Sequence, residues 1–205
     1  MPVYQFENLI PVVDPTAYVH PTAVLIGDVI IAGRCYIGPN AVLRGDMGRI
    51  TVSTGANVQD SCVLHSFPAA DMFIEEDGHI GHAAVLHGCR IARNAMVGMG
   101  AVIMDGVHIG EACIVGALTF VKANFRAPPR SLVLGSPARV VRDLTDEEIA
   151  WKSAGTHEYH QLVGRSARTL RPCEPLSTEE PDRPRLPGGM APLADHRAQR
   201  LENAG

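Results

Sequence analysis

Aliphatic residues recur at every sixth position along most of the chain, with three interruptions of the step. The series is Val19, Leu25, Ile31, Ile37, Leu43, Val52, Val58, Leu64, Ile74, Ile80, Leu86, Ile91, Val97, Ile103, Ile109, Val115 and Val121. Small residues usually follow four positions later, as Ala23, Cys35, Ala41, Ala56, Cys62, Ala84, Ala95, Ala101 and Cys113 do. This is the signature of hexapeptide repeats in a parallel β-helix, and it predicts an all-β solenoid.

Three repeats close one coil of about 18 residues, with the aliphatic residues stacked as the core. The predicted solenoid covers residues 1–126, with a loop at 67–73. Residues 127–170 form an exit segment and a C-terminal α-helix, because Thr145 and Glu148 make a capping box. Residues 171–205 are rich in proline and are expected to be a mobile tail.

Composition excludes several classes of partner. Of the 205 residues, 46% are hydrophobic and 20% are charged, and the net charge is −4. There is no basic block, which argues against nucleic acid, and no apolar run long enough for a membrane span. The start of the chain shows no secretory signal, and the five cysteines form no CxxC pair. We therefore expect reduced thiols, a cytoplasmic location and a small-molecule substrate.

Three histidines are the strongest candidates for chemistry. His65 follows Leu64, and His87 follows Leu86. Those two histidines therefore occupy the same place one coil apart, at about 4.8 Å. His82 lies one strand earlier and does not reach the same point within one chain. A homotrimer that brings His82 of one copy to the His65–His87 pair of the next predicts a three-histidine zinc site between subunits. Iron or cobalt is an alternative metal.

Polar residues surround this site where a core needs none. Arg44 and Asp46 are expected to form an ion pair. Asn57, Gln59 and Asp60 flank Val58, one strand before Leu64. Gln59 is a candidate to hold a substrate oxygen, and Asp60 to orient Arg44 or a histidine. The apolar residues of the 67–73 loop, Phe67, Met72 and Phe73, suit an apolar acyl group or pack onto the protein.

These motifs resemble the γ-class carbonic anhydrase family over about residues 10–145. The resemblance is carried by Arg44-Gly-Asp46, Asn57-Val-Gln59-Asp60, His65 and Gly81-His82 through Leu86-His87-Gly88. It implies a left-handed β-helix trimer with zinc sites at subunit interfaces. The implied ligands are His65, His82 and His87, with Arg44, Asp46, Asn57, Gln59 and Asp60 lining the site.

Both ends of the chain narrow the resemblance to the phenylacetate-degradation members, with the carnitine-operon hexapeptide proteins as near relatives. Pro2-Val-Tyr4 and the segment from Ala150-Trp151 to Glu158-Tyr159 carry this similarity. It implies hydrolysis of acyl-CoA thioesters by a zinc-bound hydroxide, in which Tyr159 either donates a hydrogen bond or only packs. Hydration of CO2 is the first alternative. Met47, which stands where the archaeal anhydrase prototype has glutamate, favours the thioesterase.

A second alternative needs no metal. Hexapeptide solenoids also include acyl-CoA-dependent acyltransferases, which use a catalytic histidine as a base. This hypothesis predicts an acyl-transfer activity that survives a chelator and requires a hydroxyl or amine acceptor.

Overall fold

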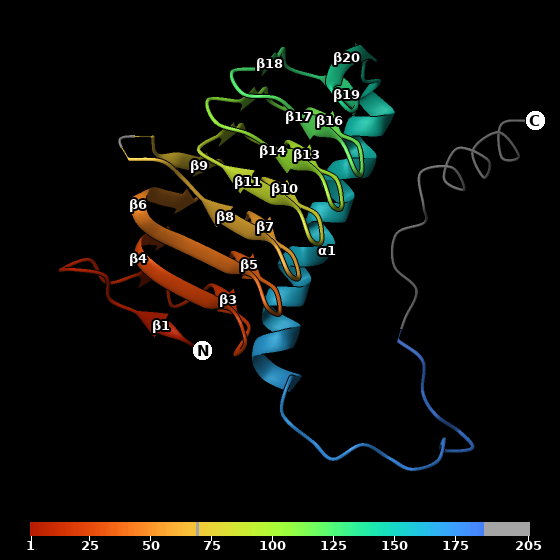
Figure 1. Ribbon diagram of the computed structural model, residues 1–205. Helices are drawn as coiled ribbons and strands as arrows, with labels where there is room; N and C mark the ends of the chain where they lie inside the picture. Colours follow the sequence, from red (N-terminus) through yellow and green to blue (C-terminus); the bar gives the residue numbers. More distant parts are fainter. Residues whose placement is uncertain (69, 187–205) are drawn as a thin grey trace, which may run out of the picture.

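The computed structural model describes residues 1–68 and 70–186, and it confirms a parallel β-solenoid with a C-terminal helix (Figure 1). The chain winds through about seven turns. Each turn places short strands on three faces, and the aliphatic residue of each repeat points inward. Leu25, Leu43, Leu64 and Leu86, on successive turns, are all fully buried. The core is therefore a stack of aliphatic residues along one axis.

One face of the solenoid is covered by the helix α1 and is called the helix face here. Its strands are β3 (Tyr18–Val19), β5 (Tyr36–Ile37), β7 (Asn57–Val58), β10 (His79–Ile80), β13 (Met96–Val97), β16 (Ile114–Val115) and β19 (Ser131–Gly135). These strands pair in parallel in that order, and β20 (Ala138–Asp143) closes the sheet by pairing antiparallel with β19.

The other two faces share a second sheet, because β4 (Val24–Ile31) and β6 (Val42–Val52) bend around the corner between them. The face called apolar contains the first parts of β4 and β6, then β8 (Val63–His65), β11 (Val85–His87), β14 (Val102–Ile103) and β17 (Phe120–Val121). The face called polar contains β2 (Val12–Val13), the second parts of β4 and β6, then β9 (Met72–Ile74), β12 (Arg90–Ile91), β15 (His108–Ile109) and β18 (Arg126–Ala127). β1 (Val3–Tyr4) pairs with β4.

The helix α1 (Asp146–Thr169) runs back along the helix face from β20 toward β3 and β5 (Figure 1). The predicted capping box is present, since the Glu148 backbone N–H donates to the Thr145 hydroxyl and the Thr145 N–H donates to the Glu148 carboxylate. The buried residues of α1 are mostly polar, and they are Glu148, Lys152, Thr156, Val163 and Ser166. The helix is therefore held by hydrogen bonds as well as by apolar packing.

The solenoid continues past residue 126, beyond its predicted end. β18 and β19 pair in parallel with β15 and β16, so they add to the coil. Ala127 and Val133 take the next two inward positions and are 6% and 0% exposed. The sequence analysis ended the solenoid too early for two reasons. Ala127 is smaller than the Val, Leu and Ile residues that mark the other repeats, and two prolines, Pro128 and Pro129, follow it.

The loop after His65 is shorter than the predicted 67–73. Met72 is fully buried in β9, and the Arg90 guanidinium lies 5.1 Å from the centre of the Phe73 ring. Met72 and Phe73 thus belong to the solenoid, and of the three apolar candidates only Phe67 stays largely exposed.

The C-terminal tail is described only in part. Residues 171–186 are exposed and contain no helix or strand, while residues 187–205 of the predicted tail lie outside the described residues. In the part of the chain that the structure describes, no helix is long and apolar enough to cross a membrane.

We expect truncation of an inward residue to cost far more stability than the same change on the surface. Leu86→Ala removes a fully buried side chain from the axial stack, and should lower the free energy of unfolding by about 2–5 kcal/mol. Leu118→Ala is the matched control, because Leu118 is 79% exposed. Denaturant unfolding of both variants tests this, and equal losses would contradict the axial core.

Candidate functional site

Four chemically distinct residues stack at one corner of the solenoid, between the helix face and the apolar face. Asp60, His82, Met99 and Ala117 occupy equivalent corner positions on consecutive turns. Backbone hydrogen bonds fix this stacking. The N–H of Ala83 donates to Asp60 O at 2.8 Å, that of Gly100 to His82 O at 2.9 Å, and that of Leu118 to Met99 O at 2.9 Å. The repeat therefore aligns an acid, an imidazole and two apolar side chains along one edge.

Asp60 and His82 form a pair, called the corner dyad. The Nδ1 atom of His82 lies 3.1 Å from Asp60 Oδ2, and both side chains are nearly half exposed. Among the described residues, none bonds to Nε2 of His82. A carboxylate on one ring nitrogen and a free second nitrogen make an oriented general base. Of the two partners predicted for Asp60, Arg44 or a histidine, the structure places His82 against it.

A second cluster lies at the opposite end of the same apolar-face strands, and it is called the edge cluster. Its members are Arg44, Asp46, His65, His87 and Asp105. Parallel register places Arg44, His65 and His87 side by side on β6, β8 and β11. His65 Nδ1 lies 3.0 Å from His87 Nε2. His65 Nε2 lies 3.1 Å from Asp46, and His87 Nδ1 lies 2.5 Å from Asp105. Both rings therefore have both nitrogens engaged.

The charges of the edge cluster are balanced locally. The expected ion pair is confirmed, because Arg44 Nη1 lies 2.9 Å from Asp46 Oδ2. Burial acts to raise the pKa of Asp46, but hydrogen bonds from Arg44 and His65 outweigh it and lower that pKa overall. Burial, followed by the charge of Arg44, lowers the pKa of His65. The cluster thus favours an ionised Asp46 beside a neutral His65.

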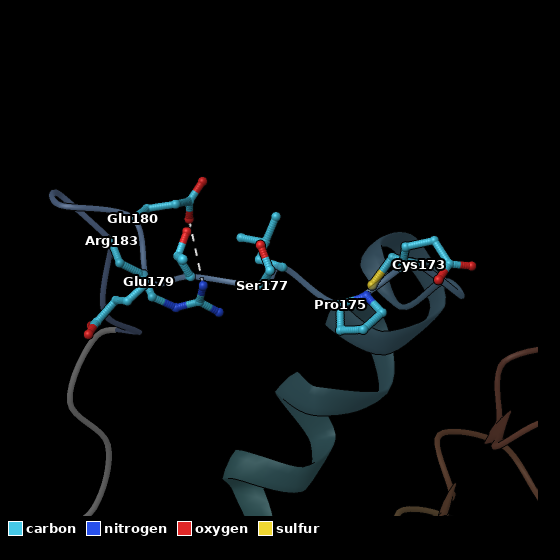
Figure 2. A pocket seen from close by; sticks show the side chains of 9 residues that line it. Cys173, Pro175, Ser177, Glu179, Glu180 and Arg183 are labelled. Atoms are coloured by element: carbon cyan, nitrogen blue, oxygen red, sulfur yellow. Dashed lines mark ion pairs between the residues drawn. The ribbon is translucent and has the colours of Figure 1, made fainter.

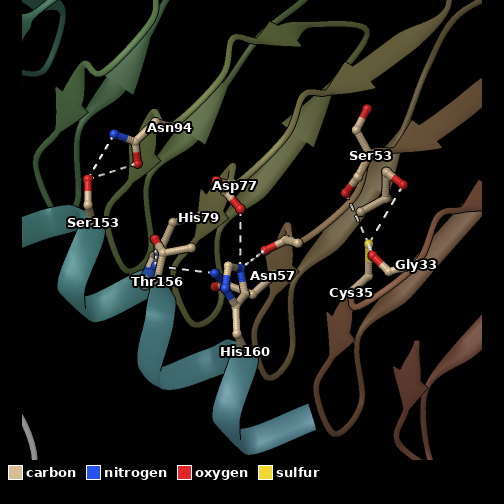
Figure 3. Close-up of polar contacts among 12 residues, drawn as sticks. Gly33, Cys35, Ser53, Asn57, Asp77, His79, Asn94, Ser153, Thr156 and His160 are labelled. Atoms are coloured by element: carbon tan, nitrogen blue, oxygen red, sulfur yellow. Dashed lines mark hydrogen bonds and ion pairs between the residues drawn. The ribbon is translucent and has the colours of Figure 1, made fainter. Parts of the chain in front are cut away.

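A third group of polar residues is buried under α1 and centres on His79, which the sequence analysis did not single out. The Gln59 amide nitrogen lies 2.7 Å from His79 Nε2 and 3.0 Å from Asn57 Oδ1. His79 Nδ1 faces Asn57 and, at 3.3 Å, the hydroxyl of Thr156 on α1 (Figure 3). Asn57 and Gln59 are 0% and 2% exposed. His79 therefore links the solenoid to α1 through Thr156, and Gln59 and Asn57 hold its ring in place.

Burial dominates the electrostatics of this group. It lowers the pKa of His79 to about 3, with the nearby charge of Lys152 adding to the effect. Burial also lowers the pKa of Lys152 to about 7. The Lys152 ammonium donates to the Asp77 backbone oxygen at 2.8 Å and to Asn94 Oδ1 at 2.7 Å. Figure 3 shows Asn94 and Ser153 in the same contact zone between α1 and the solenoid.

A cavity of about 300 Å³ opens beside the corner dyad, and it is called the corner hollow. Its lining residues are Gln59, His79, Gly81, His82, Met96, Val97, Gly98, Met99, Ala117 and Tyr159. Tyr159 of α1 therefore lines the same cavity as His82, and its ring packs against His79 and Tyr36. The sequence could not reveal this hollow, because it depends on where α1 lies over the corner.

A larger hollow of about 670 Å³ lies away from these groups, in the exposed segment after α1 (Figure 2). All its lining residues belong to residues 173–183, and Arg183 pairs with Glu180 across it. No residue of the solenoid contributes to it, so it brings none of the candidate catalytic groups together.

Comparison with known proteins places the chain among hexapeptide-repeat proteins. A family model described as bacterial transferase hexapeptide (six repeats) matches residues 88–123. The carnitine operon protein CaiE of Escherichia coli is 56% identical over 188 residues, which cover 92% of this chain and 96% of CaiE. A putative acetyltransferase from Bacillus cereus aligns with a TM-score of 0.79 and 32% identity, over 80% of this chain and 95% of that one. A hexapeptide transferase family protein from Anaplasma phagocytophilum aligns with a TM-score of 0.77 and 33% identity, over 80% of this chain and 97% of that one.

The chain belongs to the hexapeptide-repeat family that includes CaiE. This assignment supports the left-handed sense of the coil. It does not confirm the resemblance to γ-class carbonic anhydrases or to the phenylacetate-degradation proteins.

The expected zinc, with iron or cobalt as alternatives, is contradicted. Within the described residues, no group of three or more His, Cys, Asp or Glu side chains is placed to hold a metal ion. His65 and His87 bond to each other, while His82 pairs with Asp60 at the other end of the strands. The Bacillus cereus relative is named as a putative acetyltransferase. The expected metal sites between subunits are therefore unsupported.

We expect removal of His79 to flatten the acid side of the stability profile. The native ring has a pKa of about 3, whereas the ordinary value is 6.5. The unfolded chain therefore takes up the proton first, and the free energy of unfolding falls as the pH drops from 6.5 toward 3. The contribution of the ring is complete above pH 6.5. Denaturant midpoints should fall less between pH 6.5 and pH 4 in His79→Gln than in the wild type.

Leu86→Ala serves as the control for this experiment, because it lowers stability without removing an imidazole. It should keep the wild-type dependence on pH. A His79→Gln profile as steep as the wild-type profile would show that His79 does not titrate on unfolding.

Proposed function

We propose that this protein is an acyltransferase that moves an acyl group from a CoA thioester to a hydroxyl or amine acceptor. The carrying observation is the corner dyad, in which Asp60 holds Nδ1 of His82 while Nε2 stays open beside a 300 Å³ hollow. The transferase hexapeptide match and the Bacillus cereus relative support the same class. This is the metal-free alternative raised by the sequence.

The proposed reaction uses His82 as acid and base in turn. Nε2 takes the proton from the acceptor as the acceptor oxygen or nitrogen attacks the thioester carbonyl carbon. The bond from carbon to sulfur then breaks, and the CoA sulfur leaves with the proton that His82 returns. Asp60 accepts a hydrogen bond from the Nδ1–H group of His82 throughout the reaction, and its charge stabilises the transient imidazolium.

Tyr159 is the proposed donor to the developing oxyanion, because it lines the hollow together with His82. Burial raises the pKa of Tyr159 to about 12, so its hydroxyl keeps its proton at neutral pH. A preorganised donor of this kind stabilises the charge that forms on the carbonyl oxygen. Asn57 and Gln59 are proposed to position His79 beneath this tyrosine.

The apolar face supports a homotrimer. Its outward side chains form an apolar row made of Val24, Val42, Val63, Val85, Val102 and Phe120. Val63, Val85 and Phe120 are 42%, 38% and 39% exposed. The helix face is covered by α1, and the polar face carries Arg90, His108 and Arg126. An exposed apolar row of this kind marks a contact surface. We propose that copies of the chain pack together through this face. The edge cluster of one copy, with Arg44 and Asp46, would then lie against the corner dyad of the next copy.

Acyl transfer should depend on His82 and not on a chelator. His82→Asn should lower kcat by at least about 100-fold, the range for loss of a general base. The assay follows CoA thiol release from acyl-CoA with a panel of hydroxyl and amine acceptors. The control is His157→Asn on the exposed side of α1, which should retain wild-type turnover. Thiol release without any acceptor, or loss of activity on chelation, would overturn the proposed transfer.

Assembly should depend on the apolar face alone. Val85→Asp places a charge in the centre of the apolar row and should shift the mass measured by light scattering from three chains toward one. Thr51→Asp makes a comparable change in the outward row of the polar face and should leave a trimer. A wild-type monomer, or dissociation by Thr51→Asp alone, would refute this interface.

A further inference from the structure

The corner hollow extends from His82 in one direction along the solenoid. Asp60 lies one turn before His82, whereas Met99 and Ala117 lie one and two turns after it, as the backbone hydrogen bonds between these turns show. Stacked strands are about 4.8 Å apart, so Ala117 lies roughly 10 Å from His82 along the axis. The acid–base pair therefore stands at one end of an edge whose remaining positions are apolar.

The floor of the hollow is backbone, because glycine occupies the first corner position on these turns. A Cβ at Gly98 would lie 2.5 Å from the Ala117 nitrogen, and one at Gly81 would lie 2.9 Å from the Met99 nitrogen. Side chains are excluded there by close approach of the next turn. At the same corner position, Gln59 does carry a side chain, but it is directed to Asn57 and His79 and is 2% exposed. The space in front of the glycines stays open.

The walls that a single chain supplies offer no fixed charge to a ligand. Of the residues that line the hollow, none is an aspartate, glutamate, lysine or arginine. Met96 and Met99 supply flexible apolar surface, and Tyr159 supplies the face toward α1. Buried His79 is neutral at physiological pH, since burial lowers its pKa to about 3. Within one chain, a carboxylate or phosphate would lose hydration here without gaining a charged partner, whereas moving an alkyl or aryl chain out of water is favourable.

We propose, on the basis of the acyl transfer argued above, that the corner hollow holds the apolar chain of the donor acyl group. The carbonyl carbon lies at His82, and the chain runs over Gly98 and Met99 toward Ala117. Ala117 limits the chain length, because it is the last side chain that lines the hollow. The substrate class is thus a medium-length, uncharged acyl thioester, rather than acetyl or a dicarboxylic acyl group.

Narrowing the far end of the hollow tests this assignment. The readout is the ratio of kcat/KM for octanoyl-CoA to that for acetyl-CoA, measured on the full-length assembled protein. The wild-type ratio should exceed about ten, because each added methylene that leaves water favours the longer donor. Ala117→Phe should reduce the ratio at least tenfold. Ala154→Phe, the same change at an exposed position of α1, should not move it. A ratio that is near one in the wild type, or unchanged in Ala117→Phe, would overturn the assignment.

A binding experiment separates this inference from the proposed reaction. Octanoyl-CoA and free CoA are titrated calorimetrically into His82→Asn, with and without Ala117→Phe. We expect octanoyl-CoA to bind at least tenfold more tightly than CoA, and the advantage to disappear with Ala117→Phe. If this holds but the wild type transfers no acyl group, the proposed reaction fails while the acyl pocket stands. If the wild type transfers acyl groups but octanoyl-CoA and free CoA bind equally, the proposed reaction stands and the acyl pocket is refuted.

Discussion

The inward stacking of aliphatic residues at a six-residue period is the constraint on which the rest of this structure depends. Each inward residue contacts its equivalents one turn before and one turn after, so the phase of one strand fixes the phase of the next. Leu43, Leu64 and Leu86 stay in register although the connections between the repeats differ in length. Extra residues are accommodated at the corners and in the loop after His65, where they do not disturb the axis.

The same phase determines which polar residues meet. Equivalent positions on successive turns lie one strand spacing apart, so residues about 18 positions apart in sequence become neighbours. The separation is 22 where the turn includes the loop after His65. This relation produces the corner dyad of Asp60 and His82 and the contact between His65 and His87. The two pairs lie at opposite ends of the same strands and differ in chemistry. The edge pair is saturated by its own hydrogen bonds, whereas the corner dyad keeps Nε2 of His82 open to a hollow.

The sequence was sufficient to predict the features that the six-residue period determines. It was insufficient for the features that depend on the position of α1 or on the packing of several chains. It predicted the solenoid, the capped helix, the ion pair of Arg44 with Asp46 and the adjacency of His65 and His87. It failed at Ala127, where the period continues through a residue too small to mark it. It did not single out His79, because the residues that cover this ring, Thr156 and Tyr159, lie on α1. The metal expectation assumed that three histidines share one role, but they occupy two separate environments.

The central claim is that Asp60 and His82 act as one catalytic unit placed by the repeat. The most direct test is a double-mutant cycle on acyl-transfer kcat/KM with Asp60→Asn, His82→Asn and the combined variant. Residues that act as a unit give strongly non-additive losses. We predict that the combined variant is no slower than His82→Asn alone, within about twofold. Losses that multiply, so that the combined variant falls by the product of the two single factors, would contradict the account.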